Sequence, residues 1–292
     1  MEAGDGGDVA RRGGRDRRGS DGCRHRDSRI ACCCTATARS LCTLAAVSTS
    51  WDAQTYDRAS GPQQEWALAV LERVAGRLPT CPTVLDVGCG TGRVTERWLE
   101  LVSDGRVLAI DASQEMVELA RERLGDRARV WRQDVLDLVL DEPVDVVVST
   151  ATLHWVPDHE RLWQRLAAVL RSGGILEVQC GGRGNIDRVR EVIDAVAAES
   201  FPELEGWSPW VFAGPEETQA RLEAAGFASV RCWLEKRPTR PDNLAGFVRS
   251  SILPAHMARL NEERREPFAA TVLERVREPL DYVRLNVSAI RA

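Results

Sequence analysis

The sequence predicts a doubly wound α/β fold, in which a largely parallel β-sheet carries helices on both faces. Five strand–helix units follow one another between residues 82 and 180. A glycine-rich turn links the first apolar run to its helix, and acidic residues stand at or near the ends of the first three runs. Continuous apolar strands that alternate with helices are typical of parallel sheets with both faces covered.

Composition limits the classes of protein that fit. The 292 residues are 43% hydrophobic, which suffices for one large domain or two modest ones. No window of 18 apolar residues exists, so we expect no membrane span. The net charge of −5 argues against a general nucleic-acid binder. We expect a cytoplasmic protein without nucleic-acid or membrane partners, present as a monomer or a weak homodimer.

Residues 1–47 differ from the rest of the chain. They hold nine Arg against six acidic residues and five of the nine Cys. A basic arm and a transit peptide are possible interpretations, although the acidic residues oppose the second. We prefer an upstream stretch outside the protein proper, because Val47 precedes the first fold signal and valine can be encoded by an alternative start codon. We predict a disordered extension over 1–47 and a domain over 48–292.

The cysteines form no C-x-x-C pair, so we predict no metal site and expect reduced, structural thiols. The domain opens with a segment that contains Trp51, Tyr56 and Asp57, followed by a predicted helix over Pro62–Arg77. Pro62 suits the first helical turn, because its missing N–H has no helical partner there. This opening segment, 51–78, is expected to act as a lid.

The glycine-rich turn follows a predicted strand, Val84–Val87, and precedes a predicted helix, Arg93–Val102. Backbone can approach a ligand closely at such a turn, and the helix N-terminus adds free N–H groups. Arg93 stands where a dinucleotide motif has its third glycine, and no Gly-Lys-Ser/Thr follows. Asp86 disfavours phosphates and favours a cationic amino-acid ligand.

The next two predicted strands also end in acids. Arg106–Ile110 ends at Asp111, about twenty residues past the glycines, where a carboxylate suits the hydroxyls of a ribose. Ser113 is a predicted N-cap of the following helix, on which Ala112 and Met116 are placed to pack against an adenine. The strand Ala128–Trp131 precedes Asp134 and Val135, the third acidic position.

The fourth predicted strand, Val144–Val148, leads into the loop Ser149–Trp155, which should face the reacting group. We expect His154 and Trp155 to be its chemically active residues. A helix capped by Asp158 is predicted to end at Gly173-Gly174, before a fifth strand at Ile175–Val178. His159 is expected on the helix surface, and the two histidines are too weak a signal for a metal.

After residue 181 the alternation breaks. An insertion over 181–215 carries a predicted helix, Ile186–Ala198, and then Trp207, Trp210 and Phe212, which could roof the site. The C-terminal part, 216–292, holds these further predicted elements: a helix at Glu216–Ala225, a strand at Ser229–Leu234, a helical stretch over 241–278 and a last strand at Leu280–Ile290.

From about residue 51, these motifs resemble the class I S-adenosylmethionine (SAM) methyltransferases, and among them the trans-aconitate methyltransferase type. The resemblance rests on D-x-G-C-G-x-G at 86–92, I-D-x-S-x-x-M at 110–116, D-V at 134–135 and L-H-W-V-P-D-H at 153–159. It implies a Rossmann-like sheet of seven strands, with the last one antiparallel and inserted between the fifth and sixth, a small helical cap, and SAM as cofactor. The cofactor-binding residues expected from the motifs and the resemblance are Tyr56, Asp86, Gly88, Cys89, Gly90, Gly92, Asp111, Ala112, Met116, Asp134, Val135 and Ser149.

The resemblance further implies methyl transfer to a carboxylate oxygen of a small organic acid. Such a substrate needs anchors, and the expected ones besides Trp155 are Gln63, Gln64, Arg183 and Trp210. One alternative is O- or N-methylation of a natural-product hydroxyl or amine with His154 as base; another is a SAM-binding module without catalysis. The chain lacks the N/D-P-P-Y/F, Pro-Cys and paired-glutamate patterns of DNA and protein-arginine methyltransferases.

Overall fold

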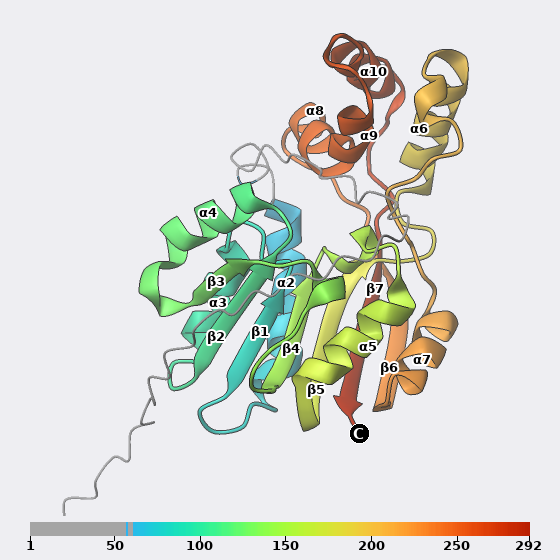
Figure 1. The fold of residues 1–292 in the computed structure, drawn as a ribbon. Coiled ribbons are helices and arrows are strands. Elements are labelled where there is room, and N and C mark those ends of the chain that lie inside the picture. Colours follow the sequence, from blue (N-terminus) through green and yellow to red (C-terminus); the bar gives the residue numbers. More distant parts are fainter. Residues whose placement is uncertain (1–56, 58–60) are drawn as a thin grey trace, which may run out of the picture. The chain divides into compact units, whose positions relative to one another are not determined.

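The computed structural model describes residue 57 and residues 61–292, with side chains at 57 and from 65 onward. The predictions for 1–47 and for residues 51–56 and 58–60 of the lid, including Tyr56, lie outside the described residues. So do the side chains of Gln63 and Gln64. The described part forms one sheet, helices on its two faces and a helical cap (Figure 1).

The sheet has seven strands in the order β3-β2-β1-β4-β5-β7-β6. Strand β7 is antiparallel to both of its neighbours, whereas the remaining paired strands are parallel. This confirms the predicted doubly wound α/β class with a last strand inserted between the fifth and sixth. The strands are β1 (Thr83–Val87), β2 (Arg106–Asp111), β3 (Arg129–Arg132), β4 (Val144–Thr150), β5 (Leu170–Gly181), β6 (Phe227–Lys236) and β7 (Val283–Arg291).

Two sets of helices bury the two faces of the sheet. On one face lie α2 (Gly61–Ala75), α3 (Arg93–Leu101) and α4 (Gln114–Leu124), and on the other α5 (His159–Val169) and α7 (Pro215–Ala224). Ser113 caps α4 as predicted, because its hydroxyl accepts the Met116 N–H. Successive strand residues point to opposite faces, so each apolar strand serves both layers.

A helical cap lies above the β5–β7–β6 end of the sheet in Figure 1 and has a hydrophobic cluster of its own. The predicted helical stretch over 241–278 is helical from Leu244 to Arg275, and it is divided into several short helices. Pro254 starts a new helix where a backbone N–H is missing, and Asn261 caps the next one with its side chain. The cap consists of α6 (Asp187–Ser200), α8 (Leu244–Phe247), the π-helical turn Val248–Ile252, α9 (Pro254–Arg259) and α10 (Glu262–Arg275).

Two local predictions on α5 and β5 are also corrected. Helix α5 ends at Val169, and β5 begins at Leu170, which pairs with Val144, so Gly173 and Gly174 lie inside the strand and do not end the helix. His159 is buried at the start of α5, where its Nε2 lies 3.1 Å from the Leu153 carbonyl oxygen. The helix thus ends before the two glycines because Leu170 already pairs with Val144 of β4.

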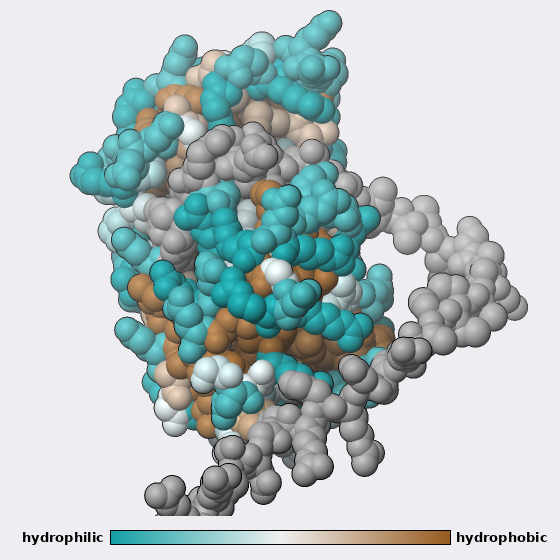
Figure 2. Space-filling model, turned by 90° about the vertical axis from the view of Figure 1, so that its left-hand side faces the viewer, coloured by the Kyte–Doolittle hydropathy of each residue, from teal (hydrophilic) through white to brown (hydrophobic). Residues whose placement is uncertain are grey.

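The surface is mixed. On the face shown in Figure 2, hydrophobic residues reach the surface in patches among hydrophilic ones. None of the helices in the described part is long and apolar enough to cross a membrane.

Candidate active site

The glycine turn between β1 and α3 is held by backbone hydrogen bonds that leave one side of it open. Gly88, Gly90 and Gly92 all have positive φ, and the N–H groups of Gly88 and Cys89 donate to the Ile110 carbonyl on β2. A Cβ at Gly88 would collide with the side chain of Thr152, and one at Gly92 would press on α4. Among the described residues, a Cβ at Gly90 would meet nothing within 4 Å, so Gly90 faces open space in this part of the chain.

Two carboxyls lie beside this turn, the buried Asp86 and the half-buried Asp111. Asp111 accepts the Gly90 N–H and the Ser113 N–H, each at 2.9 Å, and burial raises its pKa. Asp86 accepts the Thr95 hydroxyl at 2.7 Å. Burial raises the pKa of Asp86 to about 7, although the Thr95 hydrogen bond opposes the shift and the charge of Asp111 adds to it. The site thus holds negative charge that a cationic ligand would stabilise.

Asp57, in the lid segment before α2, binds directly to the glycine turn. It accepts hydrogen bonds from both Arg93 and Arg123, at 2.7–3.1 Å, and from the Thr91 hydroxyl. Burial alone would raise the pKa of Asp57, but the Arg93, Arg123 and Thr91 hydrogen bonds hold it well below its ordinary value. Arg93, which replaces a glycine of the dinucleotide motif, therefore fixes the lid segment to the turn.

The loop after β4 is tied to the same turn. The Ser149 hydroxyl donates to the Val87 carbonyl at 2.7 Å, and the Thr152 hydroxyl donates to the Gly88 carbonyl at 3.1 Å. Ala151 has a positive φ of 56°, a conformation that is strained for a residue with a Cβ. The predicted cofactor residue Ser149 thus uses its hydroxyl to join two strand ends.

The remaining predicted cofactor residues line the edge beyond β2 and β3. Ala112 and Asp134 are exposed, whereas Met116 and Val135 are buried. The Asp134 carboxylate accepts the Leu136 N–H at 2.9 Å. Cys89 is buried among apolar residues of α4, and burial raises the pKa of its thiol, so it packs as a small hydrophobic side chain.

His154 is buried beside the end of β5. Its Nδ1 accepts the Gly181 N–H at 3.2 Å, so the proton of the neutral ring is on Nε2. Burial lowers the pKa of His154 well below its ordinary value, and the positive charge of Arg284 lowers it further. His154 is therefore a neutral imidazole that presents a donor.

An aromatic wall connects this loop to the insertion over 181–215. The Trp155 ring lies 5.7 Å from the Trp210 ring, and the Phe212 ring lies 5.6 Å from both Trp210 and His154. The Val211 N–H donates to the His154 carbonyl at 2.8 Å, which fixes the insertion against the loop. The insertion thus packs on the predicted reactive residues.

Arg183, a predicted substrate anchor, has protein partners instead. Its guanidinium lies 3.2 Å from Glu217 and 3.7 Å from Glu216 at the start of α7, and its side chain is 60% exposed. These contacts direct it toward α7.

Sequence reasoning missed Arg284, the second residue of β7. It pairs with Gly181 at the end of β5, next to His154. It is 1% exposed, and its guanidinium lies 4.4 Å from the centre of the Trp66 ring of α2. The residue was missed because an arginine in a weakly alternating strand is usually an exposed one.

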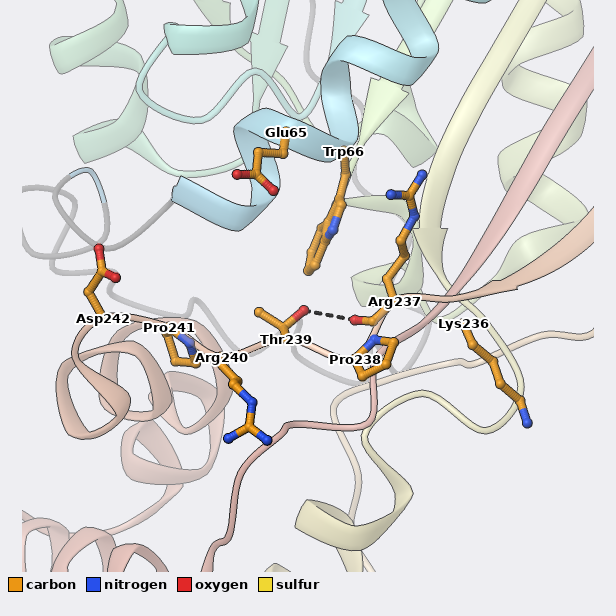
Figure 3. A pocket seen from close by; sticks show the side chains of 9 residues that line it. All are labelled: Glu65, Trp66, Lys236, Arg237, Pro238, Thr239, Arg240, Pro241 and Asp242. Atoms are coloured by element: carbon orange, nitrogen blue, oxygen red, sulfur yellow. Dashed lines mark hydrogen bonds between the residues drawn. The ribbon is translucent and has the colours of Figure 1, made fainter.

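A cavity of ≈ 380 Å³ lies between α2 and residues 236–242. Glu65 and Trp66 come from α2, and the other wall is the segment after β6, whose Thr239 hydroxyl donates to the Arg237 carbonyl (Figure 3). Its lining includes none of the glycine-turn residues, so the cavity is separate from that turn. Trp66 forms a common boundary between the cavity and Arg284.

Comparison with known proteins decides the family. A methyltransferase domain family matches residues 84–174. A trans-aconitate 2-methyltransferase of Rhodococcus jostii is 35% identical over 187 residues, which cover 63% of this chain and 71% of that protein. The chain belongs to the class I SAM-dependent methyltransferases. A trans-aconitate 2-methyltransferase of Mycolicibacterium gilvum is 38% identical over 161 residues, which cover 55% of this chain and 59% of that protein.

Solved structures of other proteins share the fold. YcgJ of Bacillus subtilis matches with a TM-score of 0.54 at 17% identity, over 78% of this chain and 98% of that chain. The phosphoethanolamine N-methyltransferase 2 of Haemonchus contortus, solved with SAM, matches with a TM-score of 0.55 at 17% identity, over 82% of this chain and 56% of that chain.

SAM is the cofactor of this methyltransferase. The residues present fit it, since the described residues leave open space at the missing Cβ of Gly90, whose N–H donates to Asp111. Within the described part of the chain, no group of three His, Cys, Asp or Glu side chains could hold a metal ion.

We expect Asp57→Asn to lower the affinity for S-adenosylhomocysteine (SAH) about tenfold, because charge-assisted hydrogen bonds from two arginines are lost. The lid segment should also become more sensitive to limited proteolysis. Glu100→Gln is the matched control, since Glu100 pairs with Arg97 on the outer surface of α3. Calorimetry with SAH that gives equal affinities for both variants would contradict a role of Asp57 in closing the site.

Asp86 predicts a pH dependence of SAH binding. Its pKa of about 7 in the free protein is raised, so the protonated form is stabilised and the carboxylate must form when a cationic ligand binds. Affinity should therefore fall about tenfold between pH 8 and pH 6, with proton release on binding. Because the pKa of Asp86 is higher in the folded protein than in the unfolded chain, its contribution to the free energy of unfolding without cofactor is greatest at low pH. That contribution is lost as the pH rises through 7. Asp86→Asn should flatten the binding profile, and a profile unchanged by this substitution would contradict the assignment.

Proposed function

We propose that this methyltransferase transfers the methyl group of SAM to a carboxylate oxygen of a small organic acid. One observation carries the proposal: the Gly181 N–H occupies His154 Nδ1, so the free ring nitrogen, Nε2, carries a proton. A hydroxyl or ammonium acceptor needs a base, whereas a carboxylate is already ionised at neutral pH and needs hydrogen-bond donors. His154 is set up as a donor.

The names of several relatives agree with an acid substrate. The R. jostii and M. gilvum proteins are trans-aconitate 2-methyltransferases. The matched segments cover only 59% of the M. gilvum protein, so the acid itself is left open.

SAM supplies an activated methyl group on a positive sulfur. The chain's own task is to align the acceptor oxygen within about 3–3.5 Å of the reacting carbon and to exclude water. Trp155, Trp210 and Phe212 form an apolar wall beside His154 that excludes water. His154 Nε2–H, with Trp155 beside it, is placed to orient the acid.

The test is a panel of trans-aconitate, succinate, a phenol and an aliphatic amine with labelled SAM, on the wild type and two His154 variants. For an acid, we expect His154→Ala to lose about tenfold or less in turnover, because one hydrogen bond is removed, and His154→Gln to recover part of it as a donor.

A base would behave differently. Loss of a general base typically costs about 10²–10⁴ in rate, and glutamine cannot replace it. Methylation of the phenol or amine but of no acid, with equal collapse in both variants, would overturn the carboxylate proposal. A chain that binds SAH but methylates nothing in a wide panel would favour the non-catalytic alternative.

A further inference from the structure

The loop after β4 ends in a single turn of 3₁₀ helix, Leu153–Trp155, which carries His154. A turn of this length makes few hydrogen bonds of its own, and one of them joins the Trp155 N–H to the Thr152 carbonyl at 2.9 Å. The orientation of the His154 ring therefore depends on contacts from other parts of the chain.

Three such contacts meet at His154. The Gly181 N–H donates to its ring at 3.2 Å, and the Val211 N–H donates to its carbonyl at 2.8 Å. The third contact acts on the preceding peptide: His159 Nε2 lies 3.1 Å from the Leu153 carbonyl oxygen, which also accepts one backbone N–H. Because a peptide group is planar, a donor that holds the Leu153 oxygen also fixes the direction of the His154 N–H.

The protonation state of His159 follows from this contact. A carbonyl oxygen only accepts, so Nε2 donates and Nδ1 is the bare nitrogen of a neutral ring. Within the described part of the chain, Nδ1 has no hydrogen-bond partner, and the residue is 5% exposed. Burial lowers the pKa of His159, although the hydrogen bond to Leu153 opposes the shift. A charged ring would bury a second N–H without an acceptor, so the neutral ring is the stable one.

The surroundings of His159 hold its ring in place. His159 is the first residue of α5, and the side chain of Asp158 caps this helix by accepting the Arg161 N–H at 2.9 Å. The buried Trp163 ring lies edge-on to the imidazole, with 6.0 Å between the ring centres. The donor that holds the loop thus stands on a capped helix and not on the loop itself, which is what precise positioning requires.

We propose that His159 is a positioning residue for His154: its Nε2–H fixes the Leu153–His154 peptide, so that the His154 ring presents its own Nε2–H to the methyl acceptor. This inference rests on the proposed function in so far as His154 orients the acid. His159 acts through the backbone of the loop, and its side chain does not bind the substrate.

The rival is a purely structural role, in which His159 only fills space beside Trp163. Two amide variants separate the roles, because glutamine places its side-chain N–H near the position of Nε2, whereas asparagine places it near the position of Nδ1. Both amides are polar and uncharged. Positioning predicts that only glutamine replaces His159, whereas space filling predicts that His154 is indifferent to the choice.

The first measurement needs no substrate. Nitrogen NMR of the full chain with labelled histidine, loaded with SAH near pH 7, reports the protonated nitrogen of each ring; the signals that vanish in His154→Gln and His159→Gln assign the two rings. In the wild type we expect both to be neutral with the proton on Nε2. His159→Gln should keep the His154 signal, and His159→Asn should shift or broaden it.

Two results of this measurement would overturn the inference and leave the proposed function standing. One is a wild-type His159 with its proton on Nδ1, and the other is a His154 signal that His159→Asn leaves unchanged. If His159→Asn does not fold, His159→Leu takes its place, since leucine fills the space without a donor. A chain that methylates only a phenol or amine overturns the carboxylate proposal, while the His154 signal still decides the role of His159.

The second measurement is turnover of the acid that the panel identifies. His159→Asn should lower it about three- to tenfold, because misplacing the His154 hydrogen bond costs no more than deleting it. In the His154→Ala background the same substitution should cost less than about twofold, since the group that it positions is absent. An equal loss in both backgrounds would contradict action through His154. SAH affinity should change less than about threefold, because the Ser149 and Thr152 hydrogen bonds to the glycine turn are kept.

Trp163→Phe is the matched control. Trp163 is 1% exposed and belongs to the same core, and its indole N–H has no partner in the part of the chain that the structure describes, so the substitution removes packing alone. It should lower the melting temperature at least as much as His159→Asn, but keep the His154 signal and the turnover. If it changes the His154 signal as much as His159→Asn does, packing explains the effect and the inference fails.

Discussion

Gly90→Val is expected to abolish SAH binding, by about 100-fold or more, while the protein stays folded. The Cβ at this position would meet nothing within 4 Å among the residues that the structure describes, so the added side chain fits without displacing them. We expect it instead to occupy the open space that the cofactor requires. Calorimetry with SAH measures the loss, and a thermal melt shows whether the fold is kept.

Backbone strain must be separated from this steric effect. Gly90 has φ +54°, and a β-branched residue is strained there. Gly125, at the far end of α4, has the same φ of +54° and also open space around its missing Cβ. Gly125→Val should thus lower the melting temperature similarly but keep SAH affinity. If both variants lose affinity equally, strain and not cofactor space explains the effect.

The fold could be predicted because its signals are local. Val144–Val148 consists of valines except for Asp145, and β4 contains all of it. Ser113 and Asp158 each begin a helix as predicted, since an N-cap needs only its own side chain and the next turn. The predicted element boundaries that were wrong depend on pairing between strands that are distant in the sequence. For example, β5 starts before Gly173 because Leu170 pairs with Val144.

The site could be predicted less completely, because its geometry joins distant segments. Asp57 and Arg93 were both singled out in the sequence, but the ion pair between them is a contact across 36 residues. Arg284 lies in a polar face of β7 that alternation alone would assign to solvent. The available signal was Glu177 and Gln179, two polar residues in the otherwise apolar run 175–180. Both are buried and pair with β7, and Glu177 also binds Arg73 of α2.

Asp111→Ala is expected to weaken SAH binding by about 1.5–3 kcal/mol, roughly 10–150-fold, because charge-assisted hydrogen bonds to a ribose would be lost. Each Asp111 oxygen already accepts one backbone N–H, from Gly90 and from Ser113, and each has a further lone pair for a ligand hydroxyl. The substitution therefore also removes support from the glycine turn, and affinity alone cannot separate the two effects.

A ligand without the hydroxyls separates them. If Asp111 binds the ribose, the 2′,3′-dideoxy analogue of SAH should bind wild type and Asp111→Ala with nearly equal affinity, because the hydrogen bonds are already missing in the ligand. If the variant loses the same factor toward SAH and toward the dideoxy analogue, Asp111 supports the turn without touching the ribose. Asp111→Asn should fall between wild type and alanine, since one amide oxygen still accepts a hydrogen bond from a hydroxyl or from the turn.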